Sequence, residues 1–142
     1  MTITQNFFID VLNTIKKEGL FCKVQSSDDE LINAIKKDDS VIIEDDYSAY
    51  FPLNDKTKKI LIDTIIRYHS EEYIHYFEIK EDDKPLFVAY DGFEIADIVA
   101  EFQFSENFIE QYVRTGLCIV LEKIIYPCDQ LKYNIQPVRI ML

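Results

Sequence analysis

Residues 72–91, EYIHYFEIKEDDKPLFVAYD, contain two runs rich in Tyr, Phe, Ile and Val on either side of a polar turn. These residue types suit a pleated strand, and a proline such as Pro85 cannot continue a central ladder, so the stretch predicts a β-hairpin. Placing Lys80 opposite Pro85 sets the expected register. The core-facing side would then hold six residues: His75, Phe77, Ile79, Leu86, Val88 and Tyr90.

The rest of the chain predicts helices and strands in a mixed order. Apolar spacing and capping residues predict helices over residues 5–18, 28–37, 55–69 and 106–115, the last three capped by Ser27, Asn54 and Ser105. Strands are expected over residues 20–25, 41–44, 47–51 and 117–125, the last a buried central strand. Residues 93–102 fit a helix, which we favour, or a third antiparallel strand after the Asp91-Gly92 turn.

These elements predict one α+β domain over residues 1–142. Its centre would be a mostly antiparallel sheet with the hairpin at about 72–91 and about four to five helices packed on it. The C-terminal tail, residues 128–142, ends in an apolar run and is expected to dock on the core or on a second copy.

Composition favours a cytoplasmic protein. Hydrophobic residues make up 48% of the chain, and no apolar run approaches the roughly 20 residues that cross a bilayer. The N-terminus lacks the pattern of a signal peptide. The cysteines, Cys22, Cys118 and Cys128, are odd in number and lack CxxC spacing, which indicates reduced thiols.

Negative charge is concentrated in two segments. Residues 26–50 hold eight acids and two lysines, and residues 71–110 hold twelve acids and two lysines, in a chain of net charge −11. Such a field repels nucleic acid and anionic membranes and attracts cationic partners. The alternative is that the acids only keep the protein soluble.

The sequence carries no recognisable catalytic or cofactor motif. Its three glycines are scattered, so a phosphate-binding loop is not expected, and we expect no cofactor, no metal site and no catalytic residue. A small hydrolase or metal-dependent enzyme using His69, His75 and nearby carboxylates is the alternative. Residues 94–112 look like a helix-turn-helix, but their second helix lacks the basic residues that DNA binding requires.

In size, acidity and lack of a catalytic signature, the chain is similar to small bacterial immunity and inhibitor proteins. That similarity implies a non-enzymatic binding module whose partner is a basic protein such as a nuclease toxin. A structural component, including a homodimer formed through the tail, is a further alternative. Tyrosines among the acids suit a protein interface, which gives a candidate partner-binding set: Asp45, Asp46, Tyr47, Tyr50, Glu72, Tyr76, Glu78, Asp82 and Asp83.

Overall fold

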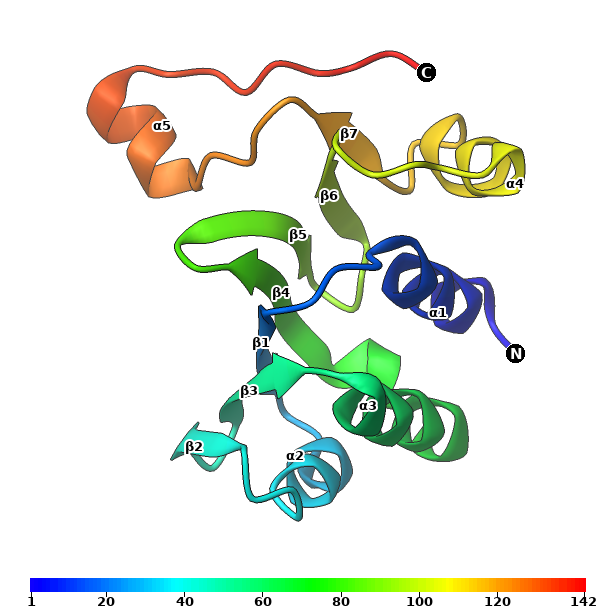
Figure 1. Ribbon diagram of the computed structural model, residues 1–142, viewed down its shortest axis with the longest axis vertical. Coiled ribbons are helices and arrows are strands. Elements are labelled where there is room, and N and C mark those ends of the chain that lie inside the picture. Colours follow the sequence, from blue (N-terminus) through cyan, green and yellow to red (C-terminus); the bar gives the residue numbers. More distant parts are fainter.

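The computed structural model describes all 142 residues as one α+β domain built on an open seven-stranded sheet (Figure 1). The strand order is β2-β3-β1-β4-β5-β6-β7. Every pair of neighbours is antiparallel except β6 and β7. The predicted fold class is confirmed.

The strands are short, β1 lies between β3 and β4, and β4, β5 and β6 form an antiparallel meander. They are β1 (Leu20–Ser26), β2 (Ile42–Asp45), β3 (Ser48–Leu53), β4 (Ile74–Glu81), β5 (Lys84–Tyr90), β6 (Ile95–Val99) and β7 (Ile119–Leu121). The helices are α1 (Ile3–Thr14), α2 (Asp29–Ile35), α3 (Asp55–Tyr68), α4 (Glu106–Phe108) and α5 (Pro127–Tyr133). A 3₁₀ turn (Ser70–Tyr73) precedes β4, and α4 continues as a π-helical turn (Ile109–Val113).

One face of the sheet carries the core. Helices α1, α3 and α4 lie on this side, and α5 lies on the opposite side (Figure 1). The rings of Phe8 and Phe77 meet edge to face with centroids 5.2 Å apart, and Phe7 meets Phe87 at 6.0 Å. Phe93 packs against both α1 phenylalanines. Large rings at close packing density supply much of the hydrophobic stabilisation here.

Side-chain caps explain where two helices begin. In α1 the Thr2 side chain accepts from the Gln5 backbone N–H, and the Gln5 side chain accepts from Thr2 in return. Asn54 and Thr57 make the same reciprocal pair at α3, as the predicted Asn54 cap requires. The prediction for Ser27 was wrong, because Asp28 caps α2 by accepting from Glu30. Either side chain can satisfy free helical N–H groups, so sequence alone misplaced this start by one residue.

The hairpin exists, and Phe77 and Ile79 are buried as predicted, but the predicted facing of the β5 side chains and of His75 was wrong. Lys80 does pair with Pro85, yet a bulge shifts the register so that Ile79 pairs with Phe87. Leu86 is the extra residue, and a bulge of this kind exchanges the two faces beyond it. Phe87 and Ala89 therefore join the helix-covered side. The opposite side, which we call the open face, receives Tyr76, Glu78, Val88 and Tyr90, while His75 is exposed at its strand's end.

Residues 93–102 contain a strand, β6, and not the helix that we favoured. β6 pairs antiparallel with β5 after a turn in which Asp91, Gly92 and Phe93 all have positive φ. The predicted central strand at 117–125 was also misplaced, because β7 has three residues and is the last named strand of the sheet. The residues of β7 are apolar because the C-terminal tail covers this strand.

The C-terminal tail returns along β7 (Figure 1). The Ile140 N–H donates to the Val120 carbonyl at 2.9 Å, and the Glu122 N–H donates to the Val138 carbonyl at 2.8 Å. Ile140 packs against the core, whereas α5 buries none of its residues. Across the whole chain, none of the helices combines the length and apolarity needed to cross a bilayer.

Candidate functional site: an acidic end of the sheet

Four connecting segments meet at one end of the sheet, where β1 and β5 finish and β3, β4 and β6 begin. Backbone hydrogen bonds tie them together: Ser26 N–H to the Tyr47 carbonyl at 2.8 Å and Ser27 N–H to the Tyr73 carbonyl at 3.1 Å. Gly92 N–H donates to the Ile74 carbonyl at 2.8 Å. A Cβ on Gly92 would lie 3.3 Å from the Glu72 carbonyl, so this close approach needs glycine.

We call this region the acidic end. Its connections carry nine carboxylates: Asp28, Asp29, Glu30, Asp45, Asp46, Glu71, Glu72, Asp91 and Glu94. Seven of them are exposed, the exceptions being half-buried Asp28 and buried Glu71. None of the nine takes part in an ion pair within 4.0 Å. The charge of the seven exposed carboxylates is therefore not compensated by any ion pair within the chain.

The opposite end of the sheet is electrostatically mixed. Lys17 bonds to Glu81 at 2.9 Å, and Lys84 bonds to Glu101 at 3.0 Å. The turn residues Asp82 and Asp83 share a surface cavity with Lys84 and Lys123. The two acidic sequence segments thus do not form one patch. The fold joins parts of both at the acidic end and distributes the remaining acids over the rest of the surface and the open face, several of them beside lysines.

The predicted partner-binding residues divide among three places. Asp45, Asp46, Tyr47 and Glu72 lie at the acidic end, and all four are exposed. Asp82 and Asp83 lie at the opposite end, because they form the turn between β4 and β5. The other three, Tyr50, Tyr76 and Glu78, lie on the open face between the two ends.

A cavity of about 390 Å³ opens at the acidic end. It is lined by Gln25, Ser26, Ser27, Asp45, Tyr47, Ser48 and His75. Tyr47 is 57% exposed, and its backbone N–H donates to the Asp45 carboxylate at 2.8 Å. An aromatic ring, a carboxylate and hydroxyl groups therefore surround one small space.

On the open face, a buried carboxylate is held by tyrosines. Glu78 is only 4% exposed, and it accepts hydrogen bonds from the Tyr76 hydroxyl at 2.7 Å and from the Tyr126 hydroxyl. Burial, reinforced by these bonds to Glu78, raises the pKa of both tyrosines, so the hydroxyls stay protonated and remain donors. Glu78 anchors the segment before α5 and cannot itself meet a partner.

Asp97 lies in the same row of the open face as Glu78, separated from it by Val88. Burial raises the pKa of its carboxyl group. A raised pKa in the folded state favours the protonated acid, so the stability cost of Asp97 grows as the pH rises above the usual aspartate range and is complete above the raised pKa. We expect Asp97→Asn to stabilise the protein at pH 7. The gain should shrink as the pH falls towards the usual aspartate range, which urea unfolding at pH 7 and pH 4 measures. An equal gain at both values would contradict this account.

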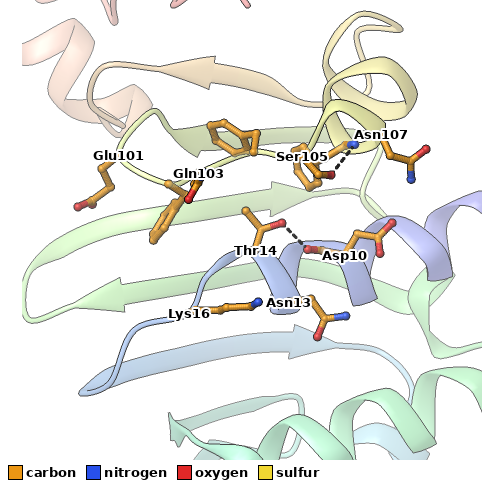
Figure 2. Close-up of a pocket in the computed structure, with 11 residues that line it drawn as sticks. Asp10, Asn13, Thr14, Lys16, Glu101, Gln103, Ser105 and Asn107 are labelled. Atoms are coloured by element: carbon orange, nitrogen blue, oxygen red, sulfur yellow. Dashed lines mark hydrogen bonds between the residues drawn. The ribbon is translucent and has the colours of Figure 1, made fainter.

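A polar cleft of about 620 Å³ lies between the end of α1 and residues 101–108 (Figure 2). Figure 2 shows Asp10 and Thr14 on one wall and Gln103 and Ser105 on the other. The principal polar groups already have partners in the chain: Asp10 accepts from the Tyr112 hydroxyl, Thr14 donates to the Asp10 carbonyl, and Ser105 caps Phe108. The Asp10–Tyr112 bond holds the π-helical turn after α4 against α1, and the other two bonds stabilise the ends of their own helices.

The histidines and cysteines have separate surroundings. His69, in the left-handed conformation after α3, lies with its Nδ1 3.0 Å from the Gln5 amide, whereas His75 lines the acidic-end cavity. No group of three or more His, Cys, Asp or Glu side chains could hold a metal ion. Burial raises the pKa of the Cys22 and Cys118 thiols, which disfavours the nucleophilic thiolate, and Cys128 is exposed.

Sequence reasoning missed several residues of these sites. Tyr126 stood in an unassigned segment, and Asp97 was hidden by the helical interpretation of residues 93–102. Tyr73 is absent from the predicted set, although it is 49% exposed at the acidic end. The Asp91-Gly92 turn was the signal that could have placed Asp97 on a strand.

Comparison of the chain with protein-family models, with curated proteins and with solved structures found no match. Function must therefore be inferred from the site itself.

Proposed function

We propose that the protein is a non-enzymatic, immunity- or inhibitor-type module that binds a basic protein through the acidic end. The observation that carries this proposal is the set of seven exposed carboxylates there that have no ion-pair partner in the chain. A nuclease toxin, whose surface must attract phosphates, has the charge that this end would attract.

The physical basis is electrostatic steering followed by short-range contact. Unpaired like charges produce a field that speeds the approach of an oppositely charged partner. Tyr47 and Tyr73 are about half exposed beside the acids, at 57% and 49%. Tyrosine supplies large contact area with little loss of side-chain entropy, so these two rings are the expected anchors.

Matched charge variants test the proposal. Glu72→Gln with Glu94→Gln removes two charges from the acidic end, and Asp82→Asn with Asp83→Asn removes two from the opposite end. The partner is first isolated by affinity capture at low salt, purified and then measured by stopped-flow association. We expect the first pair to slow association about tenfold at low ionic strength and the second pair to change it little.

Salt provides the second readout. Exposed charges are screened over about 10 Å at 0.1 M salt, so the difference between the two double variants should narrow as salt is raised. If capture yields no partner that elutes with salt, or if both double variants slow association equally, the acidic end is not the binding surface.

A further inference from the structure

We propose that the cavity at the acidic end is a receptor for an arginine side chain of the basic partner. This assignment rests on the function proposed above and specifies how that partner is recognised. The cavity's volume, about 390 Å³, lies within the range of ligand-binding pockets. Its lining supplies both features that a guanidinium group requires, a flat aromatic wall and oxygen acceptors at its edge.

The aromatic wall comes from the turn between β2 and β3. The Tyr47 side chain is 57% exposed and makes no aromatic contact within the chain, unlike Tyr50, which stacks on Phe21 with ring centroids 5.3 Å apart. More than half of the Tyr47 surface is therefore open to solvent, and no other ring stacks on it. A planar guanidinium stacks on such a face, where the cation meets the negative π-surface.

The acceptors surround this ring. Asp45 uses one carboxylate oxygen to accept from the Tyr47 backbone N–H at 2.8 Å, which fixes the carboxylate beside the ring and leaves its second oxygen free. Carboxylate oxygens are the preferred acceptors of a guanidinium. No lysine or arginine lines the cavity, and His75 is the only basic side chain there.

Ser48 adds a hydroxyl to the lining. The residue is only 5% exposed, and its side chain takes part in none of the hydrogen bonds of the neighbouring turn. The Ser26 hydroxyl, by contrast, accepts from the Asp28 backbone N–H at 3.1 Å. No buried side-chain oxygen in the chain lacks a partner, so the unbonded Ser48 hydroxyl is open to water in the cavity and is free to accept from a donor that enters it.

The neighbouring charges favour a cation. Asp46 follows Asp45 in the same turn, and Asp28 and Glu72 lie on the adjacent connections, which the Ser26–Tyr47 and Ser27–Tyr73 backbone bonds hold in place. An arginine entering here would approach a region of uncompensated negative charge. A neutral or anionic side chain would gain nothing from that field.

Titration with Nα-acetyl-arginine methylamide, followed by amide NMR shifts, tests the assignment directly. We expect saturable shifts confined to residues 25–27, 45–48 and 75, with a Kd on the order of 10 mM. Asp45→Asn and Tyr47→Leu should each weaken binding about fivefold, the upper range for a solvent-exposed ion pair or cation–π contact. Both positions are exposed, so folding should survive, which the unperturbed remainder of the spectrum verifies.

The control variant is Asp82→Asn with Asp83→Asn, which removes charge without touching the cavity and should leave Kd unchanged. Absent shifts, shifts dispersed over all the acids, or Kd values in the Asp45→Asn and Tyr47→Leu variants equal to that of the unaltered protein would overturn the assignment. Equal binding of Nα-acetyl-lysine methylamide would overturn the requirement for a guanidinium.

The two proposals fail in different ways. A salt-sensitive partner that binds Asp45→Asn and Tyr47→Leu normally would remove the arginine receptor and leave the binding function standing. Shifts at the cavity without any basic protein partner would remove the proposed binding function and leave only a cavity that binds the arginine side chain.

Discussion

Replacing Phe77 by alanine is expected to lower the free energy of unfolding by about 4 kcal/mol, because it leaves a cavity at the centre of the aromatic core. Phe77 is fully buried and touches rings from three elements: Phe8 at 5.2 Å, Phe93 at 5.9 Å and Phe87 at 6.1 Å between centroids. Urea unfolding followed by circular dichroism measures the loss. Since a domain is typically stable by only about 5–15 kcal/mol, most of the margin could disappear.

Two control variants test whether the loss of stability comes from the buried Phe77 ring. Phe77→Leu keeps most of the buried volume and should cost much less than Phe77→Ala. Tyr133→Ala removes a ring that is 59% exposed on α5 and should change stability by less than about 0.5 kcal/mol. A cost for Phe77→Ala as small as that for Tyr133→Ala would show that the Phe77 ring is not packed as described.

The second large effect concerns the attachment of the C-terminal segment. Tyr126→Phe deletes one of two hydroxyls that donate to buried Glu78, and we expect a loss of about 2 kcal/mol, as for a hydrogen bond to a charged group. Amide hydrogen exchange should also accelerate in residues 124–134, because α5 has no buried residue to hold it in place.

A double-mutant cycle identifies the interaction responsible. Combining Tyr126→Phe with Glu78→Gln should cost less than the sum of the single changes, because the carboxylate that needs the hydroxyl has been neutralised. Additive losses would mean that Tyr126 stabilises the segment through ring packing alone. The matched variant Tyr133→Phe, on exposed α5, should have no effect on either quantity.

Local sequence signals were sufficient for the fold class and for most elements. Asn54 identifies the start of α3, and Ser105 identifies the start of α4, because each side chain satisfies free backbone N–H groups of the following turn. The hairpin over β4 and β5 followed from residue composition and its polar turn. These features are decided within a few residues of the chain.

The failures have a common physical cause. Leu86 bulges out of the hairpin ladder, and nothing in its own identity distinguishes a bulged leucine from a paired one. The apolar residues of β6 satisfy helical spacing as well as strand spacing, so pairing with β5 decided between them. The position of β7 depends on pairing with β6 and on cover by a tail about 20 residues later.

The acidic character of the candidate site was predictable from the sequence, but its position in the fold was not. Charge counting identified an excess of acids, whereas the neighbour of each acid depends on strand order. Asp45 and Glu72 are brought to one end because β3 and β4 both flank β1. Asp82 is carried to the other end by the length of β4. Burial of Glu78 required the arrival of Tyr126 from 48 residues away in the chain.

The two outer strands of the sheet differ in what they offer a second molecule. The backbone of β7 is occupied by the returning tail, whereas β2 pairs only with β3 and exposes all four of its residues, Ile42 and Ile43 among them. Strand addition by another protein is therefore directed to β2. Its remaining residues, Glu44 and Asp45, are acidic, and charged side chains on an edge strand disfavour pairing between two identical molecules.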